Sequence, residues 1–99
     1  MIKVTIKYIN EKFEYLKVVG HANSAEIGKD LVCAGVSSIV VGGINNLDYS
    51  NYNIKVIEGN TEITRINSIT DHDEIVIETM IKQLETIAES YPKNIKIIK

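Results

Sequence analysis

The single cysteine of this chain, Cys33, follows one of its two histidines, His21, by twelve positions. A thiol is a weak nucleophile until it loses its proton, and a nearby imidazole can accept that proton and later return it to a leaving amine. His21 stands at the end of an expected strand and Cys33 in the first turn of an expected helix. The exposed N–H groups and the positive dipole end of a helix favour a thiolate there. The pair is therefore a candidate nucleophile and base.

Four neighbours of this pair are candidates for supporting roles. Asp30 precedes the helix and is a good N-cap residue; a carboxylate so close to the thiol opposes thiolate formation, which favours capping over a catalytic role. Ser37 follows Cys33 by four positions and shares its helix face, where it either allows close packing or forms a hydrogen bond in the site. Gly20 and Ala22 flank the histidine and leave room for a substrate to approach its ring.

Each candidate also has a structural explanation. On composition alone, a lone cysteine among leucine, valine and alanine is most often an inert buried side chain, and a histidine at a strand end is usually solvated. The position of Cys33 three residues after the expected cap argues against the inert reading, because the first turn of a helix has backbone donors without partners.

Neither a metal ion nor a cofactor is expected. The second histidine, His72, lies between two aspartates at an expected helix start, where its ring is predicted to be solvated. One cysteine and two histidines lack the ligand spacing of a zinc site. Gly42-Gly43 lacks the lysine and hydroxyl residue of a phosphate loop, and we predict that it is a close-packing surface.

Composition favours one domain over residues 1–99, with 44% hydrophobic residues and a net charge of −2. The lysines are scattered along the chain, so we expect no direct nucleic-acid partner and no membrane partner. The amino terminus alternates instead of forming an apolar signal core, and no apolar run approaches the ~20 residues of a membrane helix. A lone cysteine agrees with a reducing compartment, and the expected location is the cytoplasm.

Hydrophobic patterning predicts seven elements. Period-two alternation predicts two hairpins and a final strand, with the second hairpin turning at Gly59-Asn60. A helix that is apolar nearly all round, and hence buried, is expected over residues 31–47. An amphipathic helix follows from Asp71, with a capping box formed by Thr70 and Asp73 or by Asp71 and Glu74. The expected strands cover residues 2–9, 13–19, 53–58, 61–67 and 95–98.

The resulting order is ββαββαβ. Two hairpins cannot hide their apolar faces alone, so we predict an α+β two-layer sandwich with a largely antiparallel sheet and both helices packed on one face. The apolar first helix has more hydrophobic surface than one sheet covers, and this predicts a homodimer.

The motif around the candidate pair resembles the signature of a known family. Gly20-His21-Ala22, then Gly28, then Asp30-Leu31-Val32-Cys33-Ala34-Gly35-Val36-Ser37 is similar to the signature of the ribosomal-processing cysteine proteases of the Prp family. A Gly-His pair at a strand end with Asp-x-x-Cys-Ala opening a helix is far more distinctive than either part alone. The resemblance extends over essentially the whole chain.

The resemblance implies a specific activity. Members remove the N-terminal extension of large-subunit ribosomal protein twenty-seven at a short motif rich in aromatic and other apolar residues. By similarity Cys33 is the nucleophile and His21 the general base and acid, with Asp30 and Ser37 in support. A mobile loop over residues 22–29, with Gly20, Ala22 and Gly28 as its substrate-contacting positions, and a homodimer are also implied.

Two other classes of function are compatible with the residues. One is a non-enzymatic ribosome assembly factor or ribosomal-protein-binding factor in which Cys33 is merely buried, and the other is a redox-sensing thiol protein. Labelling by iodoacetamide across pH 5 to 9 distinguishes them. The protease labels fast, the binding factor slowly, and the sensor loses labelling after peroxide treatment.

Overall fold

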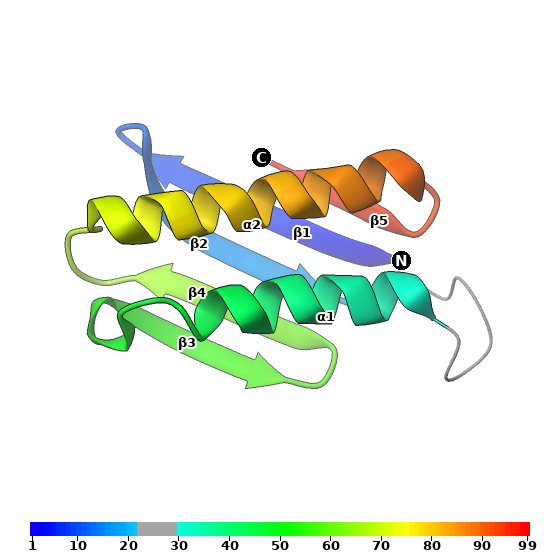
Figure 1. Ribbon diagram of the computed structural model, residues 1–99, viewed down its shortest axis with the longest axis horizontal. Helices are drawn as coiled ribbons and strands as arrows, with labels where there is room; N and C mark the ends of the chain where they lie inside the picture. The colour runs from blue at the N-terminus through cyan, green and yellow to red at the C-terminus, as the bar shows by residue number, and fades with distance from the viewer. Residues whose placement is uncertain (22–29) are drawn as a thin grey trace.

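The structure is a computed structural model that describes residues 1–21 and 30–99. In this part of the chain, two helices lie on one face of a five-stranded sheet (Figure 1). The predicted ββαββαβ order and the α+β architecture are confirmed, with a short 3₁₀ helix, η1, as an addition. The elements are β1 (Ile2–Ile9), β2 (Lys12–Val19), α1 (Leu31–Ile44), η1 (Tyr49–Asn51), β3 (Tyr52–Ile57), β4 (Asn60–Arg65), α2 (Asp71–Ser90) and β5 (Ile95–Ile98).

The strands follow the spatial order β3-β4-β2-β1-β5. Pairing is antiparallel between β1 and β2, β2 and β4, and β3 and β4, and it is parallel between β1 and β5. The expected, largely antiparallel sheet is therefore confirmed, with one parallel edge. The second hairpin turns at Glu58 and Gly59, one residue earlier than predicted, because Asn60 already pairs with Ile57 and Gly59 takes the positive φ of 74° that the turn needs.

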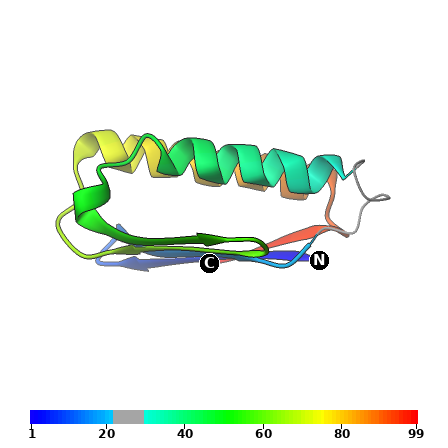
Figure 2. The same cartoon turned by 90° about the horizontal axis from the view of Figure 1, so that it is seen from below.

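The core lies between the sheet and the helices, which together cover only one face of the sheet (Figure 2). Alternation along each strand sends every second side chain to that face. On β1 these are Ile2, Val4 and Ile6, all buried. The other face of the sheet carries no helix in the described part of the chain.

Helix α1 is less buried than predicted. One stripe at four-residue steps is buried, formed by Val32, Val36, Val40 and Ile44. Leu31 on another side of the helix is 75% exposed. The expectation of burial all round is wrong because a single helical layer covers the sheet and nothing in residues 1–21 and 30–99 covers the outer side of that layer. The helix also ends at Ile44 instead of residue 47.

Helices α1 and α2 contact each other through a glycine. A Cβ atom placed on Gly43 would overlap the side chain of Met80 in α2, whereas one placed on Gly42 would meet nothing within 4 Å. The predicted close-packing surface is confirmed at Gly43 and wrong at Gly42.

The start of α2 departs from the expected capping box. The Thr70 hydroxyl accepts a hydrogen bond from the Asp73 N–H at 3.1 Å, which is the predicted first half. The Asp73 carboxylate does not return to the cap. It is buried, at 1% exposure, and accepts hydrogen bonds from the Tyr52 hydroxyl at 2.9 Å and the Asp48 N–H at 3.2 Å. These hydrogen bonds connect the start of α2 to Asp48 and to Tyr52, the first residue of β3.

The ring of His72 is largely exposed, as expected, and its Nδ1 lies 2.8 Å from Asp73 Oδ1. Neither helix of the described residues combines the length and apolarity that crossing a bilayer requires.

Candidate active site

Gly20 sets the direction in which the chain leaves β2. Its φ is +98°, a conformation that L side chains rarely adopt, and a Cβ atom there would overlap the carbonyl oxygen of Met1. Its N–H donates a hydrogen bond to the carbonyl of Gly59 at 3.1 Å. The end of β2 is therefore held between the start of β1 and the turn from β3 to β4.

This arrangement places the His21 ring against the second hairpin. A Cβ atom on Gly59 would lie 3.4 Å from His21 Nε2 and 3.8 Å from Cε1. The histidine is exposed. A glycine at the turn thus leaves room for the imidazole beside the backbone.

Cys33 lies in the first turn of α1, as predicted. The side chain of Asp30 accepts a hydrogen bond from the Cys33 N–H at 3.0 Å, and the Asp30 carbonyl accepts one from Ala34 N–H at 3.1 Å. This confirms Asp30 as the N-cap. The first turn of α1 holds no acidic residue, and the Cys33 side chain there is half-buried. The positive end of the helix dipole favours a thiolate at this position.

One cavity of about 410 Å³ brings the candidate residues together. His21, Cys33 and Ser37 all line it, and so does Gly20. The apolar part of its wall comes from Ile2, Val18, Val36, Val40, Val41, Val56 and Ile57. A thiol and an imidazole therefore lie on the wall of one largely apolar, partly open cavity.

Two predicted positions, Ala22 and Gly28, and the expected mobile loop over residues 22–29 lie outside the described residues. Within the described residues, no group of three or more histidine, cysteine, aspartate or glutamate side chains is arranged to hold a metal ion.

Known proteins resemble this chain in both sequence and structure. A sequence model of the family "Cysteine protease Prp" matches residues 1–96. The chain belongs to this family. It is 31% identical over 104 residues to the ribosomal processing cysteine protease Prp of Staphylococcus aureus, covering 98% of this chain and 97% of the relative.

Solved structures of Prp share the fold over nearly the whole chain. A crystal structure of the S. aureus essential ribosomal processing protease Prp with a covalently linked product peptide matches with a TM-score of 0.91 and 32% identity, covering 99% of this chain and 98% of that chain. A second, with a substrate peptide, matches with a TM-score of 0.84 and 29% identity, covering 98% and 97%. The resemblance inferred from the sequence is confirmed, and the chain is a cysteine protease of the Prp family.

The sequence did not reveal one wall of the Prp cavity. The second hairpin contributes residues on both sides of its turn, among them Val56, Gly59, Asn60 and Thr61. Asn60 Oδ1 is buried and has no hydrogen-bond partner in the described part of the chain. The glycine turn was visible in the sequence, but the pairing of β4 with β2, which brings this turn beside His21, was not.

Proposed function

We propose that this chain is an endopeptidase that removes the N-terminal extension of a large-subunit ribosomal protein, ribosomal protein twenty-seven, at an aromatic or apolar motif during ribosome maturation in the cytoplasm. The observation that carries the proposal is the cavity lined by both His21 and Cys33, in a chain of the Prp family. The relatives named above are ribosomal processing cysteine proteases, with structures that hold a substrate peptide or a covalently linked product peptide. The apolar wall of the cavity suits a peptide with apolar side chains.

Cys33 is the nucleophile and His21 the general base and acid in this proposal. His21 takes the thiol proton, and the sulfur attacks the scissile carbonyl carbon to form a tetrahedral intermediate. The carbon–nitrogen bond then breaks, and the imidazolium gives its proton to the leaving amine. Water, deprotonated by the same imidazole, hydrolyses the remaining thioester and restores the thiol.

The hydrogen bond of the cap limits which donors can stabilise the oxyanion. The Cys33 N–H already donates to the Asp30 carboxylate. The N–H groups of Leu31 and Val32 precede the first intrahelical bond and have no acceptor within the helix. We assign the oxyanion to the first-turn donors of α1, with the hydroxyl of Ser37, which lines the cavity, as a further donor.

Incubation with the cognate ribosomal protein carrying its extension tests the proposed function. We expect a single cut, located by intact-mass measurement, with the wild-type chain and none with Cys33→Ala. Circular dichroism establishes that the variant is folded. A folded wild-type chain that binds the extended protein without cutting it would favour a ribosomal-protein-binding factor and contradict the proposal.

We also propose a homodimer. Beside the cavity, Val41 of α1 and Val56 of β3 are 42% and 51% exposed, and Tyr49 of η1 is 56% exposed. These side chains line a second, shallow apolar hollow of about 550 Å³. Burying such a surface against a second copy of the chain removes apolar area from water.

A further inference from the structure

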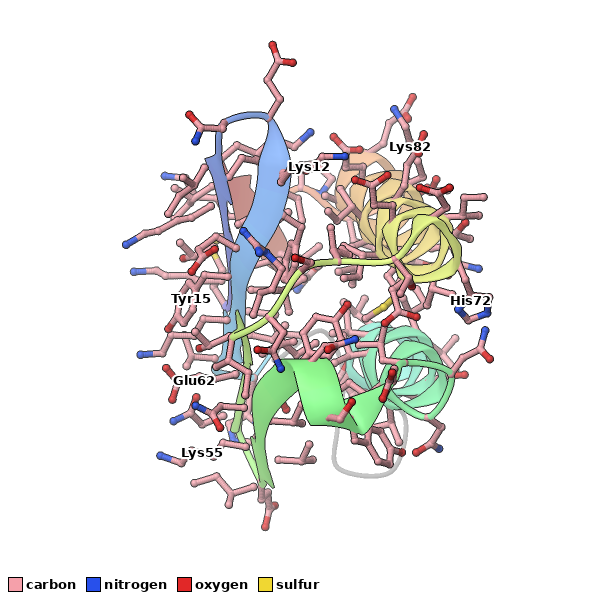
Figure 3. The ribbon with its side chains drawn as sticks, turned by 90° about the vertical axis from the view of Figure 1, so that its left-hand side faces the viewer. Lys12, Tyr15, Lys55, Glu62, His72 and Lys82 are labelled. Atoms are coloured by element: carbon pink, nitrogen blue, oxygen red, sulfur yellow. The ribbon has the colours of Figure 1, made fainter. Side chains whose placement is uncertain are left out.

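The face of the sheet that points away from the helices carries a concentration of lysines. In Figure 3, Tyr15, Glu62 and Lys55 lie on the helix-free side, whereas His72 and Lys82 lie on the helical side. Every second residue of each strand, together with its cross-strand partner, lies on the same side. The lysines of this open face are Lys3 and Lys7 of β1, Lys17 of β2, Lys55 of β3 and Lys96 of β5.

The strand register shows that these lysines form one band. Lys3 pairs directly with Lys96, and Lys17 pairs with Thr5, midway between Lys3 and Lys7. Lys55 lies beyond the intervening strand β4. Four strand spacings separate β5 from β3, so the band is about 19 Å wide.

Few carboxylates oppose this positive charge. Glu62 of β4 is the acid on the face; it accepts a hydrogen bond from the Tyr15 hydroxyl at 2.6 Å and lies 3.9 Å from Lys55 Nζ. Within residues 1–21 and 30–99, the other lysines of the open face have no carboxylate within 4.0 Å. The acids gather elsewhere, since α2 alone carries six acidic residues and one lysine.

Direct pairing of like charges costs stability in a sheet. Lys3 and Lys96 are such a pair at the edge formed by β1 and β5, and a polyanion would relieve their repulsion. Alternating lysines at fixed strand spacings suit a row of phosphates better than a bilayer. The middle of the face carries Thr5, Tyr15 and Thr64. Its exposed isoleucines, Ile57 and Ile98, lie apart on the two edge strands β3 and β5 and do not form the continuous apolar surface that a bilayer needs.

We propose that the open face of the sheet, through Lys3, Lys7, Lys17, Lys55 and Lys96, binds the phosphate backbone of RNA. Lysines scattered along the sequence predict no nucleic-acid partner, but strand alternation gathers five of them on one face of the folded chain. The choice of RNA among polyanions rests on the proposed function, since a ribosomal protein substrate lies close to ribosomal RNA. The surface would hold the protease at its substrate while the cavity, on the helical side of the sheet, stays open.

Two variants with equal net charge test this proposal. The first combines Lys3→Gln, Lys17→Gln and Lys96→Gln on the open face. The control combines Lys12→Gln, Lys82→Gln and Lys99→Gln, which lie beside α2 on the helical side of the sheet. Binding is measured by fluorescence anisotropy of a labelled oligouridylate of about 20 nucleotides at several salt concentrations between about 50 and 200 mM.

We expect salt-sensitive binding by the wild-type chain, a loss of about tenfold or more in the open-face variant at the lowest salt, and little change in the control. The slope of log affinity against log salt should fall by about 2 in the open-face variant, since each phosphate contact with a single strand contributes about 0.7. Cleavage of the isolated extended ribosomal protein should be the same in both variants, which separates this proposal from the protease function.

Three results would overturn the proposal. They are the absence of oligouridylate binding at the lowest salt, equal weakening in both variants, and binding to phosphatidylserine vesicles in place of RNA. Equal loss of oligouridylate affinity in both variants would mean that binding depends on the net charge of the protein and not on the open face.

Discussion

Cys33 of α1 and His21, which follows the end of β2, line the same cavity, so their side chains should act as one catalytic unit. Cys33→Ala removes the proposed nucleophile and changes little volume in the first turn of α1. We expect it to abolish cleavage of the extended ribosomal protein with the fold intact, and His21→Ala to do nearly the same. The double variant should lose little beyond either single one, because residues of one unit are strongly non-additive.

Single-turnover cleavage measures these variants, with circular dichroism as the folding control. Near-normal turnover by folded Cys33→Ala would rule out the proposed mechanism.

Asp73 is a buried carboxylate far from this chemistry. Its burial by itself would raise its pKa, but hydrogen bonds from His72, the Asp48 N–H and Tyr52 outweigh that effect and hold the pKa below its usual value. Burial, with the hydrogen bond to Asp73, raises the pKa of the Tyr52 phenol. Around neutral pH the carboxylate is therefore charged and the phenol protonated, which is the state in which the hydrogen bond between them forms.

Because the pKa of Asp73 is lowered in the folded protein, the free energy of unfolding depends on pH in the acidic range. Because the folded pKa of Asp73 lies below the unfolded value of about 3.9, its contribution is present above that value and is lost as the pH falls through the folded pKa. Asp73→Asn leaves at least one of the donors without an acceptor and should cost about 1–3 kcal/mol at pH 7. Urea unfolding at pH 7 and pH 3 measures the free energy of unfolding of both proteins. The difference between wild type and Asp73→Asn should be smaller at pH 3 than at pH 7. A difference in unfolding free energy that does not change with pH would contradict a charged Asp73 carboxylate in the folded protein.

The site residues could be predicted from the sequence to the extent that their signals are local. Asp30 and Cys33 share one helix start, and a cap followed three residues later by a thiol is readable without a structure. The buried role of Asp73 was missed because Tyr52, its partner, is 21 positions away. Asn60 was missed for the same reason, since its place at the cavity depends on β4 lying beside β2.

At the scale of the element, the N-terminus of α1 depends on its cap. Asp30→Ala removes the acceptor of the Cys33 N–H and should lower the free energy of unfolding by about 1 kcal/mol. Asp30→Ser keeps a hydroxyl acceptor and should restore most of that loss. Urea titration compares the two. Catalysis should suffer less in Asp30→Ala than in Cys33→Ala, and a complete loss of cleavage in the serine variant would show that the carboxylate has a catalytic role.

The two adjacent glycines of α1 should respond in opposite directions to alanine. Gly43→Ala forces the buried Met80 side chain to move and should cost about 1–3 kcal/mol through overpacking. Gly42→Ala meets nothing within 4 Å and should stabilise the helix by about 0.5–1 kcal/mol, because glycine loses more backbone entropy on folding. Thermal unfolding of the two variants checks the sign. Equal effects would mean that helix propensity alone matters at this end.

Helices and strands were predictable because each shows its own period in the sequence, and the main error followed from the number of layers. An apolar sequence all round α1 predicted burial all round, yet Leu31 and Val41 are exposed. Periodicity describes which residues can be buried, whereas the number of layers in the fold decides which of them are.

For the whole molecule, exposed apolar side chains beside the cavity lead to the proposed dimer. Analytical ultracentrifugation should give twice the mass of one chain at tens of micromolar. This is the order of magnitude of concentration at which a stable dimer is the main species. Val41→Glu combined with Tyr49→Lys should shift the protein toward monomer while Ile75→Glu, an exposed residue of α2, leaves the mass unchanged. A wild-type monomer at these concentrations would count against the dimer.

The parallel pairing of β1 with β5 can form only late in the synthesis of the chain, because it joins the first strand to the last. Ile2 pairs with Ile95, and its N–H donates to the carbonyl of Asn94 at 2.9 Å. A ribosome adding about 5–20 residues per second needs roughly 5–20 s to travel from one to the other. Through this interval one edge of β1 has no strand to pair with, and Ile2, which lines the cavity, is not yet held in place. The proposed active site is therefore complete only when the fifth strand has been synthesised, and we expect an unfinished chain to have no proteolytic activity.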